Sequence, residues 1–598
     1  MKKKIVNDFS ITVGTANGSG SQTSNTAILR ALFKMGIPVS GKNLFPSNIQ
    51  GLPTWYTIRV NKDGFTARRE EHEIVIAMNP NSFTKDLADV APGGVFFYAD
   101  DIKQAITRED IVAYPMPVKQ LVRSDPSISS GLRDMVANMV YVGILSKMIG
   151  IDMEAIRYAL DTHFKGKQKA VDLNFNIAKV SFDWAGENLE KKDPYYVEAM
   201  DRTAGMIMAD GNTAAALGSI YGGVQFVGWY PITPATSLAE SLNEYLPQLR
   251  KNEQGKNTYA VVQAEDELAA IGMCIGAGWA GLRSMTSTSG PGLSLMTEFA
   301  GLAYYTEVPV VIWDITRIGP STGLPTRTSQ GDLSFAAHMG HGDTQHIILL
   351  PGSVNECFEF GWRSFDIAER LQAPVFVLSD LDFGMNQWMT EPFIYPATPM
   401  DRGKILWEED IEALKGQWGR YLDKDKDGIS YRTLPGNSHP MGSYFLRGTG
   451  HDEYARYTED SATWERMMDK LKNKYETAKE FLPKPVINKV RGANVGLIAF
   501  GSTEPAVREA QHQLNKGLGI KADFLRVRSY PFGKEVETFI KQHETIYVVE
   551  LNRDGQMKQL LTVAYPKQAG KLVSIARSDG LSATAKWIVT EIATKEDK

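Results

Sequence analysis

Cysteine is nearly absent from this sequence, whose 598 residues include only Cys274 and Cys357. Two thiols cannot ligate a four-cysteine iron–sulfur cluster or a structural zinc ion. They suffice for one disulfide, although two free thiols in a reducing cytoplasm is the simpler interpretation. We therefore expect no metal site built from cysteines in this chain.

Long apolar runs and an excess of positive charge are also missing. No apolar run approaches the ~18 residues of a membrane-spanning helix, and the basic start (MKKKIVNDFSITVG) lacks the apolar core of a signal peptide. The net charge of −5 argues against a general nucleic-acid-binding protein. With 43% hydrophobic and 23% charged residues, the composition is typical of a folded soluble protein. We expect a cytoplasmic protein without membrane or nucleic-acid partners.

Strand-like and helix-like segments alternate along most of the chain, which predicts a multidomain α/β protein with a doubly wound parallel sheet. The expected strands are 10–15, 73–78, 94–98, 259–262, 309–313, 374–378, 495–500, 522–527 and 545–549, and the expected helices include 24–35, 134–149 and 461–482. The predicted domains are 1–190, 191–400, a strand-poor insertion at 401–485, and 486–598, with the polar stretch 187–193 as the first linker.

Three motifs each lie between an expected strand and an expected helix. They are 230–236 (YPITPAT), 263–276 (QAEDELAAIGMCIG) and 286–292 (TSTSGPG). Open α/β sheets bind ligands at the carboxyl ends of their strands, so these loops are expected to line one site. A fourth motif, 317–332 (RIGPSTGLPTRTSQGD), begins with Arg317, whose guanidinium suits a bidentate contact with a carboxylate.

Each motif also has a plain structural interpretation. The two prolines of YPITPAT stiffen the loop, which suits orientation of a small ligand by Thr233, but proline and a threonine cap are also typical of a helix entry. The acids that end at Glu267 precede an apolar helical run, where acids usually complement the helix dipole. TSTSGPG can be a simple connector, and Arg317 can form a surface ion pair.

Gly211-Asn212 and the four motifs together resemble the α subunit of 2-oxoacid:ferredoxin oxidoreductases. The resemblance covers nearly the whole chain and is closest to the 2-oxoglutarate type, in which an N-terminal γ domain is fused to α. The segment 486–598 resembles the C-terminal domain of transketolase-type enzymes. The turn GTANGSGSQTSN is a degraded form of the γ domain's usual G-x-G-G-Q-G, so a plain strand–helix connection is the alternative there.

The resemblance implies a thiamine diphosphate enzyme whose cofactor lies between this α-type pyrimidine domain and a β-type diphosphate domain. It implies oxidative decarboxylation of 2-oxoglutarate with coenzyme A to succinyl-CoA and CO₂, with electrons passed to ferredoxin, in a reversible reaction known from the reductive tricarboxylic acid cycle. The Gly-Asp-Gly…Asn signature for diphosphate and Mg²⁺ is absent from this chain, as are cluster-ligating cysteines. Mg²⁺ and a 4Fe-4S cluster are therefore expected on a β subunit, in an (αβ)₂ assembly whose α chain is inactive alone.

The resemblance also assigns roles to residues. Glu267 would hydrogen-bond the aminopyrimidine ring, while Thr233 and Arg317 would hold the 2-oxo and carboxylate groups of the substrate. The expected cofactor-binding residues are Tyr230, Pro231, Ile232, Thr233, Glu267, Ser289 and Gly290. The expected substrate or coenzyme A contacts are Thr236, Arg317, Ser321, Thr322, Arg526 and Asn552. Arg526 and Arg528 would share one face of a strand, where a surface pair is the alternative to a phosphate contact.

Several alternatives remain open at this point. The substrate can also be pyruvate or a branched-chain 2-oxoacid, and the chain can be a non-catalytic scaffold that keeps the fold. A nicotinamide dehydrogenase is a weaker hypothesis, because Gly14, Gly18 and Gly20 do not match G-x-G-x-x-G.

Two motifs suggest metal sites without completing them. The segment 423–428 (DKDKDG) opens like a calcium loop, but Leu434 takes the place of the usual bidentate glutamate, so a polar turn is the expected structure. His338, His341 and His346 have no acid at a fixed spacing, which argues against a metal site.

Overall fold

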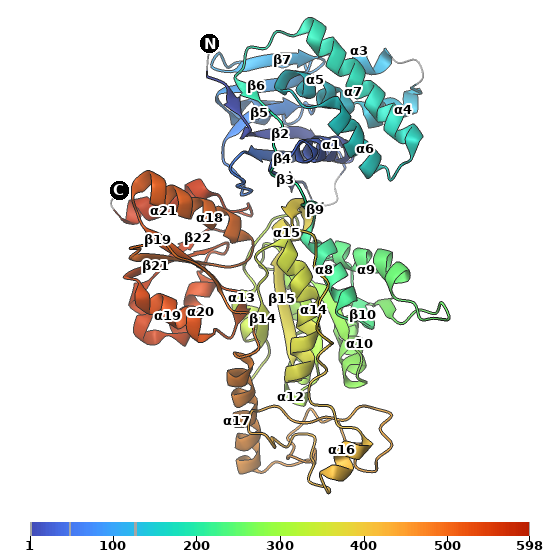
Figure 1. Ribbon diagram of the computed structural model, residues 1–598, viewed down its shortest axis with the longest axis vertical. Helices are drawn as coiled ribbons and strands as arrows, with labels where there is room; N and C mark the ends of the chain where they lie inside the picture. Colours follow the sequence, from blue (N-terminus) through green and yellow to red (C-terminus); the bar gives the residue numbers. More distant parts are fainter. Residues whose placement is uncertain (1–2, 47–49, 125–127, 597–598) are drawn as a thin grey trace. The chain divides into compact units, whose positions relative to one another are not determined.

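The computed structural model describes residues 3–46, 50–124 and 128–596, and the chain divides into two compact units (Figure 1). The first unit comprises Met1–Ala209, Asn386–Pro392 and Ala583–Trp587. The second comprises Asp210–Met385, Phe393–Ser582 and Ile588–Lys598. Among the described residues, no helix combines the length and the hydrophobicity that a membrane span requires.

The first unit is built on a mixed six-stranded sheet of order β3-β4-β2-β5-β6-β7. Its strands are β2 (Asp8–Ala16), β3 (Val39–Leu44), β4 (Pro53–Asn61), β5 (His72–Ala77), β6 (Val90–Ala99) and β7 (Val112–Met116). β4 pairs antiparallel with β2 and β3, whereas β2, β5, β6 and β7 are parallel. The strands expected at 10–15, 73–78 and 94–98 are thus confirmed.

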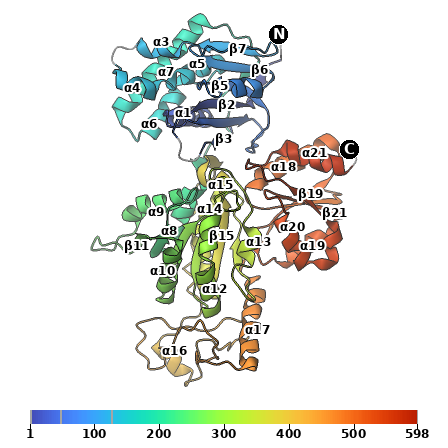
Figure 2. The same cartoon turned by 180° about the vertical axis from the view of Figure 1, so that it is seen from behind.

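Helices gather beside this sheet in both views (Figures 1 and 2). They are α1 (Ser21–Lys34), α5 (Met139–Ile149), α6 (Met153–His163) and α7 (Gln168–Asn188), with the shorter α2 (Phe83–Asp89), α3 (Val118–Arg123) and α4 (Ser130–Val136). Two short ladders complete the unit, β1 (Ile5–Val6) with β8 (Tyr195–Tyr196), and β9 (Ile207–Ala209) with β16 (Trp388–Thr390).

The prediction of a single helix at 134–149 is wrong, because the structure divides this segment between α4 and α5. The break falls at Asn138, whose side-chain amide donates to the carbonyl oxygen of Ser19 at 2.8 Å. The expected helix at 24–35 is confirmed as α1, which follows β2 through a turn that ends at the left-handed Gly20. That turn is a strand–helix connection.

The second unit contains a seven-stranded sheet of order β11-β10-β12-β13-β15-β14-β20. Its strands are β10 (Phe226–Trp229), β11 (Ala260–Gln263), β12 (Ser284–Thr288), β13 (Val310–Thr316), β14 (Ile347–Leu349), β15 (Pro374–Asp380) and β20 (Ser529–Tyr530). All pair in parallel except β20, which is antiparallel to β14. β13 and β15 are buried along their whole length, which is typical of the centre of a parallel sheet.

Two groups of helices pack with this sheet, as expected of a doubly wound fold. One group is α8 (Gly211–Tyr221), α9 (Thr236–Leu249), α14 (Val354–Leu371) and α15 (Leu381–Met385). The other is α10 (Glu267–Trp279), α11 (Gly290–Leu295) and α12 (Thr297–Thr306). The short helix α13 (Leu333–Ala337) contacts β14.

The C-terminal part has its own five-stranded sheet, β17-β19-β18-β21-β22. Its strands are β17 (Val486–Asn488), β18 (Val495–Ala499), β19 (Ala522–Arg526), β21 (Thr545–Glu550) and β22 (Leu572–Ala576), and its helices are α18 (Glu504–Gln513), α19 (Lys534–Gln542), α20 (Gln556–Ala564) and α21 (Ala585–Lys595), the last of which spans the boundary between the units. Short irregular helical turns are η1 (Gly501–Thr503), η2 (Leu514–Leu518) and η3 (Pro566–Lys571). The three strands expected here are confirmed.

Gln330 ties this C-terminal sheet to the main sheet of the unit. Its side-chain amide donates to Phe500 O at 2.8 Å and accepts from Leu551 N at 2.9 Å. Its backbone N–H donates to Leu551 O, and its carbonyl accepts from Asn552. The loop that follows β13 is therefore fastened to the ends of β18 and β21.

The segment before the C-terminal sheet has few strands, as expected, and contains α16 (Glu408–Ala413) and α17 (Ser461–Ala478). A buried ionic cluster joins α17 to the end of α12. The Glu307 carboxylate, 2% exposed, pairs with Lys470 and, at 2.5 Å, with Lys474. Arg420 donates to the Glu307 carbonyl at 2.8 Å. These contacts fix the insertion to the main sheet.

Candidate functional site

Three loops meet at one edge of the main sheet, because the strands before them are neighbours. β10 pairs in parallel with both β11 and β12. The loop after β10 leads into α9, the loop after β11 into α10, and the loop after β12 into α11. The positions predicted for YPITPAT, the acidic motif and TSTSGPG at strand–helix junctions are confirmed, and the loops form one candidate site.

The three consecutive acids at the start of α10 have different environments. Glu265 is exposed. Asp266 is the N-cap, and its carboxylate accepts from Ala269 N at 2.7 Å. Glu267 begins the helix and is 7% exposed. Asp266 is therefore the helix cap, and Glu267, in the first turn, also lies where an acid complements the helix dipole.

The Glu267 carboxylate lies against the turn that starts α11. A Cβ atom placed on Gly292 would be 2.8 Å from Glu267 Oε1 and 2.1 Å from Thr288 Oγ1. Only glycine therefore leaves room for the carboxylate at this position. Within the described chain, no side chain or backbone N–H donates a hydrogen bond to Glu267. A carboxylate that is mostly buried without a donor is costly unless a ligand supplies one.

Arg317 and Thr233 come together from different loops. Arg317 Nη1 donates to the Thr233 carbonyl at 2.7 Å, and Nη2 donates to the Thr322 carbonyl at 3.2 Å. Arg317 is 7% exposed, and its Nε–H has no acceptor among the described residues. This N–H is a buried donor without a partner in the part of the protein that the structure describes.

Asn212 donates hydrogen bonds to the YPITPAT loop and to the helix that follows it. It is 1% exposed, and its side-chain amide donates to Pro234 O at 2.9 Å and to Ser237 Oγ at 2.7 Å. Asp210 caps the same helix, α8, by accepting from Thr213 N at 2.8 Å. The sequence motif contained Asn212 but gave no role for it, because its partners are more than twenty positions away.

The remaining residues predicted for cofactor or substrate binding lie on the same loops. Tyr230 and Pro231 are exposed, and Ile232 and Thr233 are half-buried. Thr236 begins α9 and donates to Ile232 O at 3.2 Å. Ser289 is buried and precedes Gly290, and its hydroxyl has no partner in the described chain. Ser321 and Thr322 are exposed in the loop after β13.

Arg526 and Asn552 lie elsewhere in the unit and are engaged within the chain. Arg526 pairs with Glu504 and, at 2.5 Å, with Glu356. Arg528 reaches the same Glu356 carboxylate at 2.7 Å, so the two arginines share a face as predicted. Asn552 donates to Gln330 O at 3.1 Å and to Glu550 at 2.7 Å. These contacts favour a structural role over coenzyme A binding.

The calcium-like loop holds a cation that belongs to the chain itself. Lys404 Nζ donates to Asp425 at 2.7 Å, to both oxygens of Asp427 at 2.9 and 3.0 Å, and to Ile429 O at 3.0 Å. Asp423 instead accepts from Asp427 N and Gly428 N. The expected polar turn is therefore closed by an ammonium group, which could not be predicted from the loop alone.

The cysteines and histidines do not form a reactive group in the described chain. Cys274 and Cys357 are free and buried, so the disulfide alternative is wrong, and burial raises the pKa of Cys274 to about 12. His346 packs in the core, where burial lowers its pKa to about 4. No group of three or more metal-binding side chains is found among the described residues.

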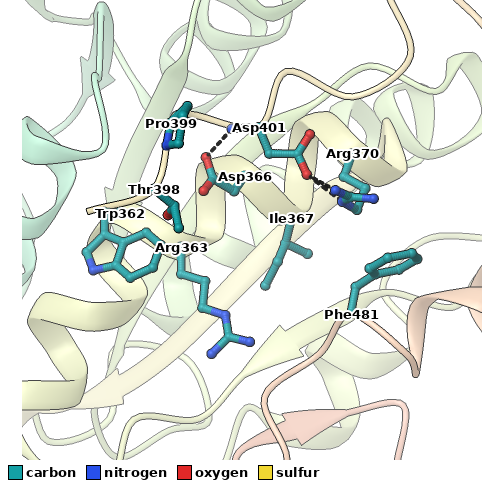
Figure 3. Close-up of a pocket in the computed structure, with 9 residues that line it drawn as sticks. All are labelled: Trp362, Arg363, Asp366, Ile367, Arg370, Thr398, Pro399, Asp401 and Phe481. Carbon is teal, nitrogen blue, oxygen red and sulfur yellow. Dashed lines mark hydrogen bonds and ion pairs between the residues drawn. The ribbon is translucent and has the colours of Figure 1, made fainter. Parts of the chain in front are cut away.

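A cavity of about 450 Å³ lies along α14, away from these loops (Figure 3). Arg370 pairs there with Asp401, and its guanidinium stacks 4.6 Å from the centre of the Phe481 ring. Asp366 accepts from Asp401 N at 3.2 Å and pairs with Arg283 at 2.7 Å. None of the nine residues drawn is a predicted site residue.

Two family models match the chain. A model described as pyruvate flavodoxin/ferredoxin oxidoreductase, thiamine diphosphate-binding, matches residues 217–392, which include the three loops. A model described as pyruvate ferredoxin/flavodoxin oxidoreductase matches residues 10–184.

Similar proteins cover nearly the whole chain. The α subunit of 2-oxoacid:ferredoxin oxidoreductase 2 from Aeropyrum pernix is 32% identical over 93% of this chain and 92% of its own length. The 2-oxoglutarate synthase subunit KorA of Methanothermobacter marburgensis is 34% identical over 58% of this chain and 88% of its own. A solved 2-oxoglutarate:ferredoxin oxidoreductase from Magnetococcus marinus, with 2-oxoglutarate, coenzyme A and succinyl-CoA bound, has a TM-score of 0.87 and 30% identity over 99% of this chain and 100% of that one.

Proposed function

Because this chain belongs to the family of 2-oxoacid:ferredoxin oxidoreductase α subunits, we propose that it supplies the pyrimidine-facing half of a thiamine diphosphate site that decarboxylates 2-oxoglutarate. The family reaction is the thiamine diphosphate-dependent oxidative decarboxylation of a 2-oxoacid. The choice of 2-oxoglutarate rests on the relatives named for this substrate. The observation that carries the site is the buried, unpartnered carboxylate of Glu267 beside Gly292.

The residues present fit a flat, nitrogen-containing ring. Glu267 offers a carboxylate without a protein donor, which fits only because Gly292 has no side chain, and Ser289 offers a buried hydroxyl without a partner. When bound, thiamine diphosphate supplies the nucleophilic carbon and the electron sink for loss of CO₂. Glu267 would accept a hydrogen bond from a ring nitrogen and hold the proton that moves between ring and carboxylate.

Arg317 and Thr233 would orient the substrate. The unpartnered Nε–H of Arg317 would donate to the carboxylate next to the 2-oxo group, while Nη1 and Nη2 each already donate one hydrogen bond to a backbone carbonyl. Those two hydrogen bonds also fix the plane of the guanidinium before the substrate binds, which reduces the entropy lost on binding. The Thr233 hydroxyl lies on the stiff loop at 230–236, whose Thr233 carbonyl accepts from Arg317.

The partners follow from what this chain lacks. We propose a β subunit that carries Mg²⁺, the diphosphate site and the 4Fe-4S cluster, ferredoxin as the electron acceptor, coenzyme A as co-substrate, and an (αβ)₂ assembly. The second carboxylate of 2-oxoglutarate needs another cation, which the β subunit would provide.

Glu267→Gln tests the proposal in the complex reconstituted with the β subunit. We expect turnover to fall by several orders of magnitude while assembly is unchanged. Glu265→Gln is the matched control, because the same change is made two positions away on an exposed side chain. Near-normal turnover of Glu267→Gln would favour the non-catalytic scaffold instead.

Substrate choice is tested separately, by comparing kcat/KM for 2-oxoglutarate, pyruvate and a branched-chain 2-oxoacid in the same complex. We expect the highest value for 2-oxoglutarate. A higher value for pyruvate would keep the family chemistry but reject the proposed substrate.

A further inference from the structure

The cavity along α14 has a lining that the proposed mechanism does not use (Figure 3). Its volume of about 450 Å³ lies within the ~300–1,000 Å³ of small-molecule sites in proteins. Arg363, Ile367 and Arg370 line it from one face of α14, since they are four and then three residues apart. A second cavity of about 190 Å³ adjoins the first, because four residues line both: Trp362, Asp366, Thr398 and Pro399.

The two arginines of the lining have hydrogen-bonding capacity left over. Arg363 Nη1 donates to Glu359 at 2.9 Å, and this carboxylate is shared with Arg528, which binds it at 2.8 Å. Within the described chain, Nε and Nη2 of Arg363 donate to no group. Arg370 pairs with Asp401 through Nε and Nη2, so its Nη1 keeps both N–H groups. Both guanidinium groups can therefore donate to a ligand.

The acids of the lining are already engaged by the chain itself. Asp366 accepts from Arg283 at 2.7 Å and from Asp401 N at 3.2 Å. Asp401 binds Arg370 and also accepts from Gly403 N at 2.9 Å. The charged groups left to meet a ligand are therefore N–H donors, which favours an anion. Guanidinium groups bind phosphate oxygens in paired geometry.

A tryptophan without a stacking partner joins the two cavities. Trp362 is half-buried and lines both of them. Its indole has no ring, cation or hydrogen-bond partner in the part of the chain that the structure describes, and Figure 3 shows it beside Arg363. The second cavity also contains Tyr221 and Tyr395, whose rings pack edge to face with centroids 4.9 Å apart. Free aromatic faces beside arginines are typical of sites that stack a nucleic-acid base.

We propose that the two cavities form one binding site for a nucleoside diphosphate such as ADP. The base stacks on Trp362 in the smaller, aromatic cavity, and the ribose and diphosphate occupy the larger one. Arg363 and Arg370 are two helical turns apart, about 10 Å along the axis, and their long side chains close on the diphosphate from both sides. The site shares no residue with the thiamine diphosphate loops.

Calorimetric titration of the full chain with ADP tests the site without turnover. We expect ADP to bind at least ten-fold more tightly than adenosine or pyrophosphate, because each of these fills only one of the two cavities. Trp362→Ala and Arg363→Gln should each weaken ADP binding by about ten-fold or more. The matched control is Arg491→Gln, the same change on an exposed arginine, which should leave the affinity unchanged. No binding to the wild type at millimolar ADP, or equal affinity in all four proteins, would overturn the proposal.

Two further measurements identify where the nucleotide binds and exclude the co-substrate. Stacking on the indole should quench tryptophan fluorescence when ADP is added, and Trp362→Phe, which keeps a ring in the lining, should abolish that change at unchanged thermal stability. Quenching that persists in Trp362→Phe would place the nucleotide elsewhere. In the complex with the β subunit, Arg363→Gln should leave KM for coenzyme A unchanged, and a several-fold rise would make the cavity a coenzyme A site instead. If that complex turns over no 2-oxoacid, the proposed function fails while the ADP titrations still decide this inference.

Discussion

Arg317 donates a 2.7 Å hydrogen bond to the backbone carbonyl of Thr233, a residue 84 positions earlier in the chain. The bond joins the loop after β13 to the loop after β10, two strands that are separated in the sheet by β12. The side chain proposed to bind the substrate therefore also joins two loops of the candidate site. Changes at Arg317 will affect loop geometry as well as binding, so its neighbours offer cleaner tests.

Asn212→Ala should weaken substrate binding through the loop that it supports. The change removes hydrogen bonds to Pro234 O and Ser237 Oγ and leaves both acceptors buried or half-buried. We expect a stability loss of about 1–3 kcal/mol and a higher KM for the 2-oxoacid. Thermal unfolding and steady-state kinetics of the reconstituted complex measure the two effects. An unchanged KM would show that the loop keeps its geometry without Asn212.

Glu307→Gln should destabilise the chain strongly, because Lys470 and Lys474 would be left buried without their shared counter-charge. We expect a loss of about 3–5 kcal/mol. Glu298→Gln is the matched control, because Glu298 is an exposed residue of α12, the helix that ends at Glu307. Denaturant titration of both variants makes the comparison, and equal stability would mean that the cluster contributes nothing net.

The same cluster predicts a dependence on acid pH. Burial alone would raise the pKa of Glu307, but Lys470, Lys474 and Arg420 outweigh it and lower the pKa to about 2. A lowered pKa gives stability that is complete above the unfolded value of ~4.3 and is lost as the pH falls towards 2. Wild-type unfolding should therefore become easier across this range, and Glu307→Gln should show a shallower slope.

Lys404→Met should turn the closed loop into a weak calcium site. The ammonium group now satisfies Asp425 and Asp427, and its loss leaves their carboxylates facing each other. We expect the wild-type melting temperature to be the same with Ca²⁺ or with chelator. The variant should melt lower in chelator and recover in millimolar Ca²⁺, the ~10⁻³–10⁻⁴ M range of weak loops. The exposed Lys424→Met is the control, and a wild type that chelator destabilises would contradict the lysine-closed loop.

Arg526→Lys separates a structural role from a coenzyme A contact. Arg526 binds both Glu356 and Glu504, and lysine keeps the charge but loses the paired geometry. We expect lower thermal stability with an unchanged KM for coenzyme A. A several-fold rise in that KM at unchanged stability would instead support the role in coenzyme A binding predicted from the sequence.

Much of the fold and the location of the site could be predicted from local patterns. The segments 309–313 and 374–378, which begin β13 and β15, are continuous apolar runs, and the loops after β10, β11 and β12 carry their prolines, acids and glycines in a short segment each. Parallel pairing then predicts that the three loops meet, so Thr233, Glu267 and Gly290 could be named as candidates without knowledge of tertiary contacts. The roles of these residues in catalysis stay predictions.

What could not be predicted depends on partners that are distant in sequence. Nothing local shows that Lys404 fills the loop at 423–428, or that Arg526 and Arg528 meet Glu356 instead of a phosphate.

The attachment of Gln330 to Phe500 and Leu551 has a consequence for protein engineering. Because the loop at 317–332 and the C-terminal sheet share these hydrogen bonds, a chimera joined near residue 486 would bring together residues that were not selected to bond to each other, unless both sides came from one parent. Recombination within this family should therefore tolerate crossovers that keep 317–332 and 500–552 together, and select against those that part them.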